Sequence, residues 1–512
     1  MNITIESQRL HLQAELDAAK TQAERNRLGQ FATPSSLAHA ILVETKRFLE
    51  SDTSIHFLDP AFGTGAFYSA LLAIYDNELI EKAEAYEIDP HYGNSAQELW
   101  QTHNLNLHLA DFTRAKPAKQ KVNLLVCNPP YVRHHHIPTE NKKYLRQKTD
   151  YKLSGLSGLY AYFLLLAHDW LTNNGIGCWL IPSEWMDVNY GQQIKQYLTT
   201  QVKLLRIHRF ATDMPQFEDA LVSSTVVWYQ KTAPNKNEPV NFTSGQLLSQ
   251  PSLEKKIPFH RLEPKTKWAH LFQANEPPAL KDSPLYLSDL FKIKRGIATG
   301  ANKFFILTPE QISTYKLPPQ FLKPILPSPR YLQRNEITAE DDGTPIISKR
   351  FFLLDCNLPE QTIKIHYPTL WQYLQFGREQ EIDKRYLCRH RRRWYEQEER
   401  PPAPILCTYM GRNQQPFRFI RNHSMATAPN VYLMLYPTPL LNHHLMQDET
   451  LLQQIWNWLT QVNGKTFKKI GRSYGGGLFK LEPRELAQLG VDKQIINQMD
   501  FMPRPVQTAF SF

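Results

Sequence analysis

The sequence predicts an α/β protein with a doubly wound sheet in its first half and a mixed α+β domain in its second. Short apolar runs bounded by turn residues alternate with helical patterns up to residue 230. A glycine-rich loop follows the first of these runs, as in nucleotide-binding folds. Beyond residues 231–250, which are polar and contain prolines, the elements become short and basic residues alternate with aromatic ones. We therefore expect one domain over residues 1–235 and another over 236–512.

The first elements are predicted to be helical. Residues 5–26 are expected to form one helix, because apolar residues recur there at helical spacing, at Leu12, Leu16, Ala19 and Ala23. The turn 27–34 (RLGQFATP) follows, and Ser35 or Ser36 can cap the next helix, which continues through residues 38–48.

A strand over Ile55–Leu58 then leads into the loop 59–67 (DPAFGTGAF) and a helix over residues 68–75. Glycines in such a loop let the backbone approach a ligand closely and free N–H groups at the helix start. The loop has neither the GxGxxG pattern nor the GK[ST] of a P-loop, which disfavours NAD and ATP. A second strand ends at Glu87, where a carboxylate can accept hydrogen bonds from both hydroxyls of a ribose.

Further strands continue the alternation. The third ends at Asp111, whose carboxylate can accept from the adenine amino group of the same ligand. The fourth is the apolar run Val122–Cys127, which is short and rich in branched residues. An apolar helix at 159–171 precedes a fifth strand at Gly175–Ile181, and more strands are expected at 202–209 and 221–229.

The fourth strand ends in Asn128-Pro129-Pro130-Tyr131. The Asn128 side-chain oxygen and the Pro129 carbonyl are two neighbouring acceptors, which suit an amine that offers both its hydrogens. Tyr131 adds a flat face on which a planar base can stack. Two such acceptors localise the lone pair of an aromatic amine, which is otherwise a poor nucleophile, so that no general base is required. Taken alone, the motif is equally compatible with a turn that ends a strand.

Charge is unevenly distributed along the 512 residues, whose formal net charge is +10. Residues 1–234 carry 22 basic and 24 acidic residues, whereas the remainder carries 37 and 25. The basic second half indicates a polyanionic partner. The five cysteines show no CxxC spacing, so neither a zinc site nor a disulfide framework is indicated. Because there is no signal peptide and no long apolar segment, the protein is expected to be soluble and cytoplasmic, without a membrane partner.

The ordered motifs RLGQFATP, DPAFGTGAF, YEIDP, ADF and NPPY, followed by a basic region, resemble the gamma-class N6-adenine DNA methyltransferases of type II restriction–modification systems, in the TaqI-like and Eco57I-like branch. The motifs cover residues 27 to 230, and the stretches 295–302 (RGIATGAN) and 472–478 (RSYGGGL) look like parts of that family's target-recognition domains. The resemblance implies a sheet that binds S-adenosylmethionine and a C-terminal target-recognition domain. It also implies methyl transfer to N6 of an adenine flipped out of duplex DNA, which protects host DNA.

The family's residue roles carry over by motif. The resemblance implies that the cofactor is held by Thr33, Pro34, Asp59, Pro60, Ala61, Gly63, Gly65, Glu87, Asp111, Phe112, Asn128 and Pro130. It implies that the target adenine meets Asn128, Pro129, Tyr131 and Phe217. Basic residues expected to contact DNA, mostly at phosphates, are Lys294, Arg295, Lys303, Arg391, Arg392, Arg393, Lys468, Lys469 and Arg472. A solvated charge run is the alternative for Arg391–Arg393.

Two features depart from the family pattern or extend it. Gly158 stands where the family often has an acidic or amide residue before Leu-Tyr, so no ligand role is assigned to it. His134–His136 follow the NPPY motif, but consecutive histidines point in different directions and the chemistry needs no metal. A DNA-facing or solvated loop is therefore favoured there.

We expect the protein to act as a monomer on double-stranded DNA, with its cognate restriction endonuclease a separate protein. Three alternatives remain open. The chain could methylate RNA or a protein amide, since NPPY occurs in such enzymes too. It could be a DNA-binding protein with a degenerate methyltransferase fold. It could also be a fused restriction enzyme, with Asp/Glu-x-Lys triplets at 140–142 and 263–265, although little chain is left for a nuclease.

Overall fold

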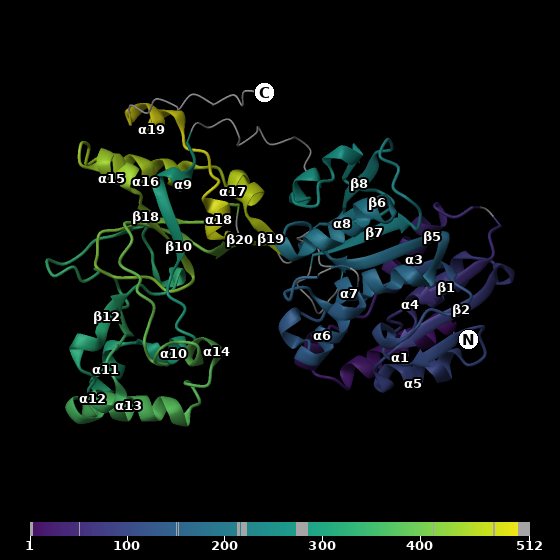
Figure 1. Cartoon of the computed structure of the whole chain (residues 1–512), viewed down its shortest axis with the longest axis horizontal. Coiled ribbons are helices and arrows are strands. Elements are labelled where there is room, and N and C mark those ends of the chain that lie inside the picture. The colour runs from purple at the N-terminus through teal and green to yellow at the C-terminus, as the bar shows by residue number, and fades with distance from the viewer. Residues whose placement is uncertain are drawn as a thin grey trace. The chain divides into compact units, whose positions relative to one another are not determined.

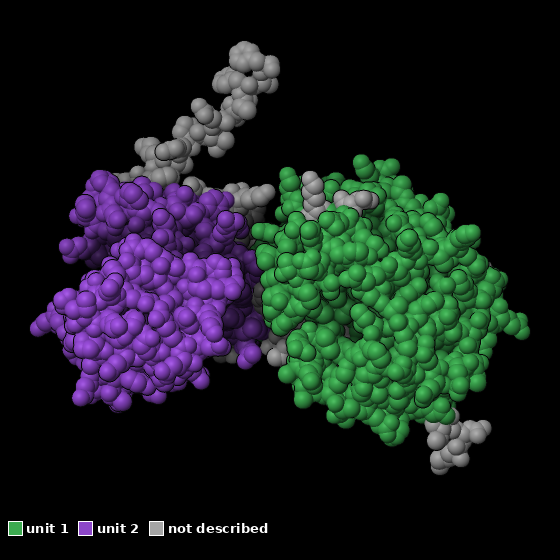
Figure 2. All heavy atoms as spheres, turned by 60° about the horizontal axis from the view of Figure 1, so that its bottom comes forward, with its two compact units in different colours: residues 1–276, 473–477 green, residues 277–472, 478–512 purple. Residues whose placement is uncertain are grey.

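The computed structural model describes residues 4–50, 52–149, 151, 153–211, 216, 223–272, 285–412, 414–474 and 477–499. The chain divides into two compact units, residues 1–276 with 473–477 and residues 277–472 with 478–512 (Figure 2). Each unit has hydrophobic clusters of its own. In the part of the chain that is described, no helix is both long and apolar enough to cross a membrane.

The first unit is built on a large sheet (Figure 1). Among the described residues it has nine strands in the order β3-β2-β1-β4-β5-β7-β6-β8-β9. The strands β3, β2, β1, β4 and β5 are parallel, and β7 runs antiparallel between β5 and β6. Their bounds are β1 Ile55–Asp59, β2 Ile80–Glu87, β3 Asn106–Leu109, β4 Val122–Cys127, β5 Leu171–Pro182, β6 Lys203–Phe210, β7 Ser224–Gln230, β8 Val240–Gly245 and β9 Leu253–Ile257. The strand order reverses between β1 and β4, the kind of position where open α/β sheets bind ligands.

Helices cover both faces of this sheet, which confirms the predicted doubly wound fold. Alternate residues of β4 belong to two different hydrophobic clusters: Leu124 and Val126 pack with α3 and α4, whereas Leu125 and Cys127 pack with α7 and α8. The helices of the unit are α1 Ile5–Ala18, α2 Gln22–Leu28, α3 Ser35–Lys46, α4 Ala66–Ile74, α5 Pro90–Trp100, α6 Thr139–Lys148, α7 Leu159–Leu166 and α8 Gln192–Thr200.

The single helix expected over residues 5–26 is two helices, α1 and α2. Thr21 begins α2 with a capping box, in which its side chain accepts from the Glu24 amide and the Glu24 carboxylate accepts from the Thr21 amide. A Thr-x-x-Glu sequence is a helix-start signal, and the apolar periodicity runs through it without a break. Helix α2 ends at Gly29, which has the left-handed φ of 68°.

The first unit continues past residue 235, where a boundary was expected. The polar segment 231–250 contains β8, which pairs in parallel with β6, and β9 then pairs antiparallel with β8. Trp268 is fully buried against the same unit, and the Lys195 ammonium donates to the Thr266 carbonyl at 2.6 Å. Buried Val240 and Phe242 alternate with half-buried Asn241, so the strand pattern is present although its composition resembles a linker.

The second unit is a mixed α+β structure, as predicted. Its main sheet has the order β10-β18-β15-β17-β13, and a smaller one the order β11-β14-β12. The strands are β10 Phe291–Arg295, β11 Ile306–Leu307, β12 Leu322–Ile325, β13 Glu336–Ile337, β14 Phe351–Leu354, β15 Ile405–Thr408, β16 Met410–Gly411, β17 Phe419–Asn422, β18 Tyr432–Pro437 and β20 Leu478–Lys480. One further strand, β19 Arg472–Tyr474, begins in this unit and continues into residues that are assigned to the first. The helices are α9 Leu287–Leu290, α10 Asn302–Phe305, α11 Pro309–Tyr315, α12 Glu360–His366, α13 Pro368–Glu379, α14 Tyr386–Arg389, α15 Pro439–Leu445, α16 Leu451–Gln461, α17 Gly464–Ile470, α18 Pro483–Leu486 and α19 Lys493–Gln498.

Candidate active site

A cavity of about 540 Å³ lies in the first unit, at the carboxyl ends of β1, β2 and β4. This volume is within the range of small-molecule sites. Its walls come from the glycine loop after β1, the end of β2, the turn after β3, the NPPY loop, α1, α6, α7 and the segment before α3. The lining includes Gln13, Asp17, Gln30, Phe31, Pro60, Ala61, Gly63, Glu87, Asp89, Tyr92, Asp111, Phe112, Arg114, Asn128, Pro130, His136, Asn141, Tyr144 and Phe163.

The glycine loop requires its glycines for two reasons. Gly63 and Gly65 have positive φ values of 58° and 93°, which side chains rarely adopt. A Cβ at Gly65 would lie 2.5 Å from the Phe62 ring and 2.7 Å from the Trp100 indole nitrogen, whereas one at Gly63 would meet open space. Gly63 therefore presents bare backbone to the cavity, and Gly65 leaves room for the Phe62 ring and the Trp100 indole.

Glu87 joins this loop to the end of β2. Its two carboxylate oxygens accept from the backbone amides of Gly63 and Asp89, each at 2.8 Å. Burial raises the pKa of Glu87 above its ordinary value, and those two hydrogen bonds oppose the rise. Each carboxylate oxygen has more than one lone pair, so Glu87 can still accept from a ligand in the cavity.

Asp59 lies behind the cavity wall rather than on it. It is 1% exposed and accepts one hydrogen bond, from the Ala61 amide at 3.1 Å. Burial, opposed by that hydrogen bond and assisted by the nearby Glu87 carboxyl, raises its pKa to about 8. Thr33, Pro34 and Gly65, which were also expected to contact the cofactor, do not line the cavity either.

Asn128 is held by the segment that precedes α3. Its Nδ2 donates to the Phe31 carbonyl at 3.0 Å and to the Thr33 hydroxyl at 3.1 Å. The Phe31 carbonyl can only accept, so the amide is oriented with its nitrogen toward it, and the Thr33 hydroxyl then accepts as well. Its Oδ1 is buried and has no partner in the protein. The loop thus presents an unpaired acceptor at a residue that lines the cavity.

The same preceding segment also fixes the backbone of the NPPY loop. The Gly29 carbonyl accepts from the Tyr131 amide at 3.1 Å. A Cβ on Gly29 would lie 2.4 Å from the Tyr131 amide nitrogen, so only glycine allows this approach. The RLGQFATP motif therefore positions both ends of the NPPY motif, which a sequence pattern alone does not reveal.

The predicted base-contacting residues are only partly brought together. Asn128 lines the cavity, whereas Pro129 is buried and Tyr131 is 8% exposed, and neither lines it. The Tyr131 hydroxyl donates to the Leu180 carbonyl at 3.1 Å, and its ring centroid lies 5.7 Å from that of Phe31. Phe217 lies outside the residues that the structure describes.

The turn after β3 forms another wall of the cavity. The Asp111 Oδ1 accepts from the amide and hydroxyl of Thr113 at 2.9 and 2.6 Å, and its Oδ2 lies 3.4 Å from the Arg114 guanidinium. The Phe112 ring packs 5.6 Å from Tyr86 and 5.5 Å from Phe163, which also lines the cavity. An apolar aromatic wall with a carboxylate beside it is suited to a purine ring.

Some lining residues were not anticipated. Gln13 and Asp17 reach the cavity from α1, and Asn141 and Tyr144 reach it from α6. Gln13 and Asp17 are four residues apart, as are Arg9 and Gln13, so the three polar side chains share one helix face. That spacing was a usable signal, although polar residues on a helix face are ordinarily solvated.

The basic residues of the second unit differ in how accessible they are. Arg391 is half-buried and donates to the Ala298 carbonyl at 2.7 Å, and Arg393 lies 3.5 Å from Glu396. The side chain of Arg392 is 72% exposed, with Glu396 3.8 Å away.

The other predicted DNA contacts are spread over both surface and packed positions. The Arg295 guanidinium lies 3.9 Å from the Tyr409 ring centre, Lys468 stacks on Phe479, and Arg472 pairs with Glu485 at 2.7 Å. Lys303 is exposed and Lys294 half-buried, while the side chain of Lys469 lies outside the described part of α17. Within the described residues no cluster of His, Cys, Asp or Glu could hold a metal ion, and His134–His136 form a short 3-10 turn of which His136 lines the cavity.

Two family models match the chain. One, described as Eco57I restriction-modification methylase, matches residues 13–217, and the other, the C-terminal domain of type II methyltransferase M.Eco57I, matches residues 269–506. Together they match most of the chain. The Type II methyltransferase M.AccI of Acinetobacter calcoaceticus is 29% identical over 485 residues, covering 90% of this chain and 85% of that protein. M.XamI of Xanthomonas campestris pv. amaranthicola is 27% identical over 478 residues, covering 91% and 85%.

A solved structure shares the fold. The Type IIL restriction-modification enzyme MmeI in complex with DNA superimposes with a TM-score of 0.52 at 12% sequence identity. The match covers 81% of this chain but only 61% of that one, so the chain spans less than two thirds of that enzyme.

Proposed function

We propose that this chain, which belongs to the type II restriction–modification methyltransferases of the Eco57I type, transfers the methyl group of S-adenosylmethionine to N6 of an adenine in duplex DNA. The observation that supports this most directly is the Asn128 amide. Its nitrogen is occupied by two protein acceptors, and its buried oxygen is left without a partner beside a ligand-sized cavity. An acceptor in that state is suited to an N–H donor.

The chemistry that follows needs positioned dipoles rather than a base. S-adenosylmethionine supplies, when bound, an activated methyl group on sulfur. The Asn128 Oδ1 and the Pro129 carbonyl oxygen would accept the two hydrogens of the adenine amino group. Their pull favours a tetrahedral nitrogen, whose lone pair is then available to the methyl carbon. Fixing donor and acceptor in line supplies much of the acceleration, because the protein performs little covalent chemistry.

The cavity suits the cofactor in charge and shape. Its wall includes the carboxylates Asp17, Glu87, Asp89 and Asp111. S-adenosylmethionine carries a sulfonium and an ammonium against a single carboxylate, so an acidic cavity favours it electrostatically. Glu87 would accept from the ribose hydroxyls, and Asp111 from the adenine amino group beside Phe112, with Pro130 near the same ring. Pro60, Ala61 and Gly63 would approach the cofactor through their backbone atoms. The residues that do not line the cavity, Asp59, Thr33, Pro34 and Gly65, would support its wall without touching the cofactor.

The target adenine would leave the helical stack to reach Asn128, at a cost of a few kcal/mol in lost stacking and pairing. We propose that Tyr131 and Phe217 stack on it. The Tyr131 ring would first have to become exposed, and its hydrogen bond to the Leu180 carbonyl is worth about 1 kcal/mol. Tyr131 would thus become exposed as part of the proposed base-flipping step, and its ring is not a preformed platform.

The second unit would recognise the DNA target. Exposed Lys303 and Arg392, together with Lys294, Arg295, Lys468, Lys469 and Arg472, are proposed to contact mostly phosphates. MmeI has a structure in complex with DNA, and the curated relatives carry the name of type II methyltransferases. Arg391 and Arg393 are turned toward protein partners and are proposed to support this unit from within. The active form would be a monomer in the cytoplasm, and the matching endonuclease a separate protein.

A methyl-transfer assay tests the proposal. The purified chain is incubated with radiolabelled S-adenosylmethionine and unmethylated duplex DNA, and the nucleosides are then separated. Label in N6-methyldeoxyadenosine is the expected result. Label in N4-methylcytosine would overturn the base, and label only in RNA or protein, offered in parallel, would overturn the substrate class.

A further inference from the structure

Helix α1 has little buried apolar surface: Ile5 packs, partly buried, against the cluster that contains α3 and α4, and Leu12 and Leu16 are half-buried. Arg9 is its one buried residue, at 1% exposure, and the others are half-buried or exposed. A surface helix normally docks through an apolar stripe. Polar contacts therefore contribute much to the docking of α1, and these are specific in direction and partner.

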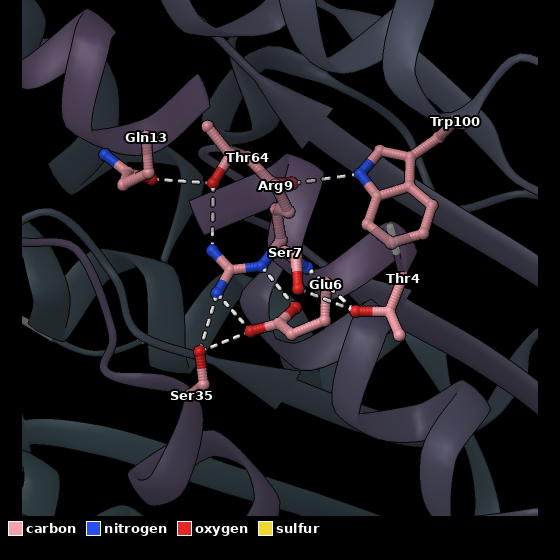
Figure 3. A network of polar contacts seen from close by, with 8 residues as sticks. All are labelled: Thr4, Glu6, Ser7, Arg9, Gln13, Ser35, Thr64 and Trp100. Carbon is pink, nitrogen blue, oxygen red and sulfur yellow. Dashed lines mark hydrogen bonds and ion pairs between the residues drawn. The ribbon is translucent and has the colours of Figure 1, made fainter. Parts of the chain in front are cut away.

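Arg9 is the centre of these contacts (Figure 3). Its guanidinium donates to both Glu6 carboxylate oxygens at 2.8 and 2.6 Å. It also donates to the Thr64 hydroxyl at 3.1 Å and to the Ser35 hydroxyl at 2.9 Å. Burial alone would raise the pKa of Glu6, but the hydrogen bonds from Arg9 and Ser35 outweigh it, and the net pKa is lowered to about 2. The Glu6 carboxylate is thus charged throughout the neutral range.

Several partners of α1 belong to segments that line the cavity. Thr64 lies in the glycine loop, and its hydroxyl donates to the Gln13 side chain at 2.6 Å. The Tyr92 hydroxyl donates to Asp17 at 2.7 Å, and Tyr92 itself lines the cavity. Just beyond α1, Lys20 pairs with Asp89, which lines the cavity after the end of β2. The helix therefore joins the two segments on either side of Glu87's carboxylate.

We propose that α1 completes the cofactor site: Gln13 and Asp17 contact S-adenosylmethionine, and Arg9 is a positioning residue that holds them there through Thr64. This inference rests on the proposed function only in taking that cofactor as the ligand. The Gln13 side-chain oxygen is occupied by Thr64, which leaves its amide nitrogen to donate into the cavity. Asp17 adds a carboxylate, and the Arg25 guanidinium lies 3.8 Å from it.

The charge of Asp17 provides a discriminating probe. S-adenosylmethionine has one more positive charge than S-adenosylhomocysteine, which lacks the sulfonium. Removing a carboxylate from the cavity wall should therefore weaken the first ligand more than the second. A defect that only loosened the helix would weaken both ligands equally.

The test compares two charge-removing substitutions on the same helix. Asp17→Asn removes the cavity carboxylate, and Glu15→Gln removes one whose side chain is 63% exposed and does not line the cavity. Calorimetric titration of the full chain should show the Kd for S-adenosylmethionine rising about tenfold in Asp17→Asn, which is ~1.4 kcal/mol. The rise for S-adenosylhomocysteine should be smaller, and Glu15→Gln should change neither by more than about twofold. Equal effects of the two substitutions would overturn the role of Asp17.

Arg9 is tested through its partner, because removing a buried charge would unfold the helix contacts altogether. Thr64→Val keeps the side-chain shape but removes the acceptor for Arg9 and the donor to Gln13, whereas Thr64→Ser keeps both. We expect the valine variant to raise the Kd and KM for the cofactor about fivefold at 15 °C, with kcat at saturating cofactor retained. The serine variant should match the parent. A valine variant with a lowered Tm but an unchanged Kd would reduce Arg9 to a purely structural role.

These outcomes are separable from those of the proposed function. If the chain labels RNA instead of DNA while Asp17→Asn still weakens cofactor binding, only the substrate assignment fails. If DNA is labelled normally and Asp17→Asn binds the cofactor as the parent does, only the role of α1 fails. An unchanged chain that binds no S-adenosylmethionine overturns both.

Discussion

Two conspicuous polar signals in the sequence are the Asn128–Tyr131 loop of the first unit and the 389–395 run (RHRRRWY) of the second. Their polar side chains have different surroundings in the structure. Each contains a buried polar atom without a protein partner, the Oδ1 of Asn128 and the Nη1 of Arg391. Asn128 lines the cavity of about 540 Å³. Arg391 lines neither that cavity nor the smaller one beside Val240 among the described residues, and its Nη2 donates to the Ala298 carbonyl.

The difference shows what an unpaired polar atom means. Leaving a buried donor or acceptor unpaired costs about 1–3 kcal/mol. Where a cavity reaches the atom, a ligand can make the missing hydrogen bond and recover that free energy on binding. Where it does not, the atom is a local cost of packing. Asn128 lines the cavity, so we assign its oxygen to the first case; Arg391, whose other nitrogen bonds to a carbonyl of the protein, we assign to the second.

The largest expected effect is that of Asn128→Ala. If the unpaired oxygen receives the target amine, methyl transfer should fall by about 10³-fold, the range seen when a positioned polar group is removed. Cofactor binding should stay within about threefold, because most of the cavity wall is unchanged. The measurements are single-turnover label transfer to DNA and calorimetric titration of the cofactor.

Asn123→Ala is the matched control, because Asn123 is in β4, the strand that Asn128 follows, but both polar atoms of its amide are paired. Its Nδ2 donates to the Ser54 carbonyl at 2.6 Å and its Oδ1 accepts from the His56 amide at 2.8 Å. This variant should lose about 1–2 kcal/mol of stability and keep its turnover per folded molecule. Near-normal methyl transfer by Asn128→Ala would remove the basis of the contrast between the two regions.

A second prediction concerns what holds the loop in place. Gly29→Ala forces a side chain into a left-handed conformation and against the Tyr131 backbone, so the NPPY loop must shift. We expect methyl transfer to fall ten- to a hundredfold, in line with an approximately 1 Å misplacement. Gly343→Ala is the control: its φ is 83°, but its Cβ would meet the flexible Met425 side chain in the second unit. Equal loss of turnover in both variants would mean that stability alone explains the effect.

A third prediction extends the contrast to a buried titratable group, the carboxyl of Asp59. Because the pKa of Asp59 is raised to about 8, the folded chain keeps a proton that the unfolded chain releases near pH 4. The folded state therefore binds more protons between these values, and stability falls as pH rises from about 4 to 8. Asp59→Asn stays neutral, so its stability relative to the parent should increase by about 2 kcal/mol from pH 6 to pH 8.

The measurement is the difference in Tm between parent and variant at each pH. Asp76→Asn, at an exposed position, is the control and should show a difference that does not change with pH. A pH-independent difference for Asp59→Asn as well would mean that its carboxylate is already charged at pH 6. A partner in the protein would then stabilise the charged Asp59 carboxylate, whereas the Asn128 oxygen has no partner.

The strand ends were predictable because each follows a short apolar run, and these runs are buried on both faces of the sheet. Glu87, Asp111 and Asn128 were placed at the correct edge for that reason, and they line one cavity. The glycine loop was predictable because positive φ leaves glycine as the compatible residue. In these cases a local pattern determines the backbone, and the backbone determines where the side chain lies.

The remaining features depend on contacts between distant segments, which no local pattern contains. The capping box of Thr21 divides the first helix, although the apolar periodicity continues across it. Tyr131 is a residue type suited to a stacking platform, yet its hydroxyl donates a hydrogen bond to the Leu180 carbonyl, 49 residues away in sequence. Whether an arginine faces solvent or a carbonyl 93 residues away, as Arg391 does, is likewise decided by tertiary packing.

The smallest expected effects are those of the arginine run, and they test the other half of the contrast. Arg392 is exposed, so Arg392→Gln should reduce the salt dependence of DNA binding, with a slope of log Kd against log salt smaller by about 0.9 if one phosphate contact is lost. Its Tm should be unchanged, because its carboxylate neighbour is 3.8 Å away and the Arg392 side chain itself is 72% exposed. Arg391→Gln should instead lower stability by about 1–2 kcal/mol through the lost bond to Ala298, and leave the slope as it is.

The measurements are Kd for one duplex between 50 and 200 mM salt (the range over which phosphate contacts are most evident) and Tm for each variant. If Arg391→Gln flattened the slope and kept its Tm, the guanidinium would reach phosphate after all, and burial would be a poor guide to function in this unit.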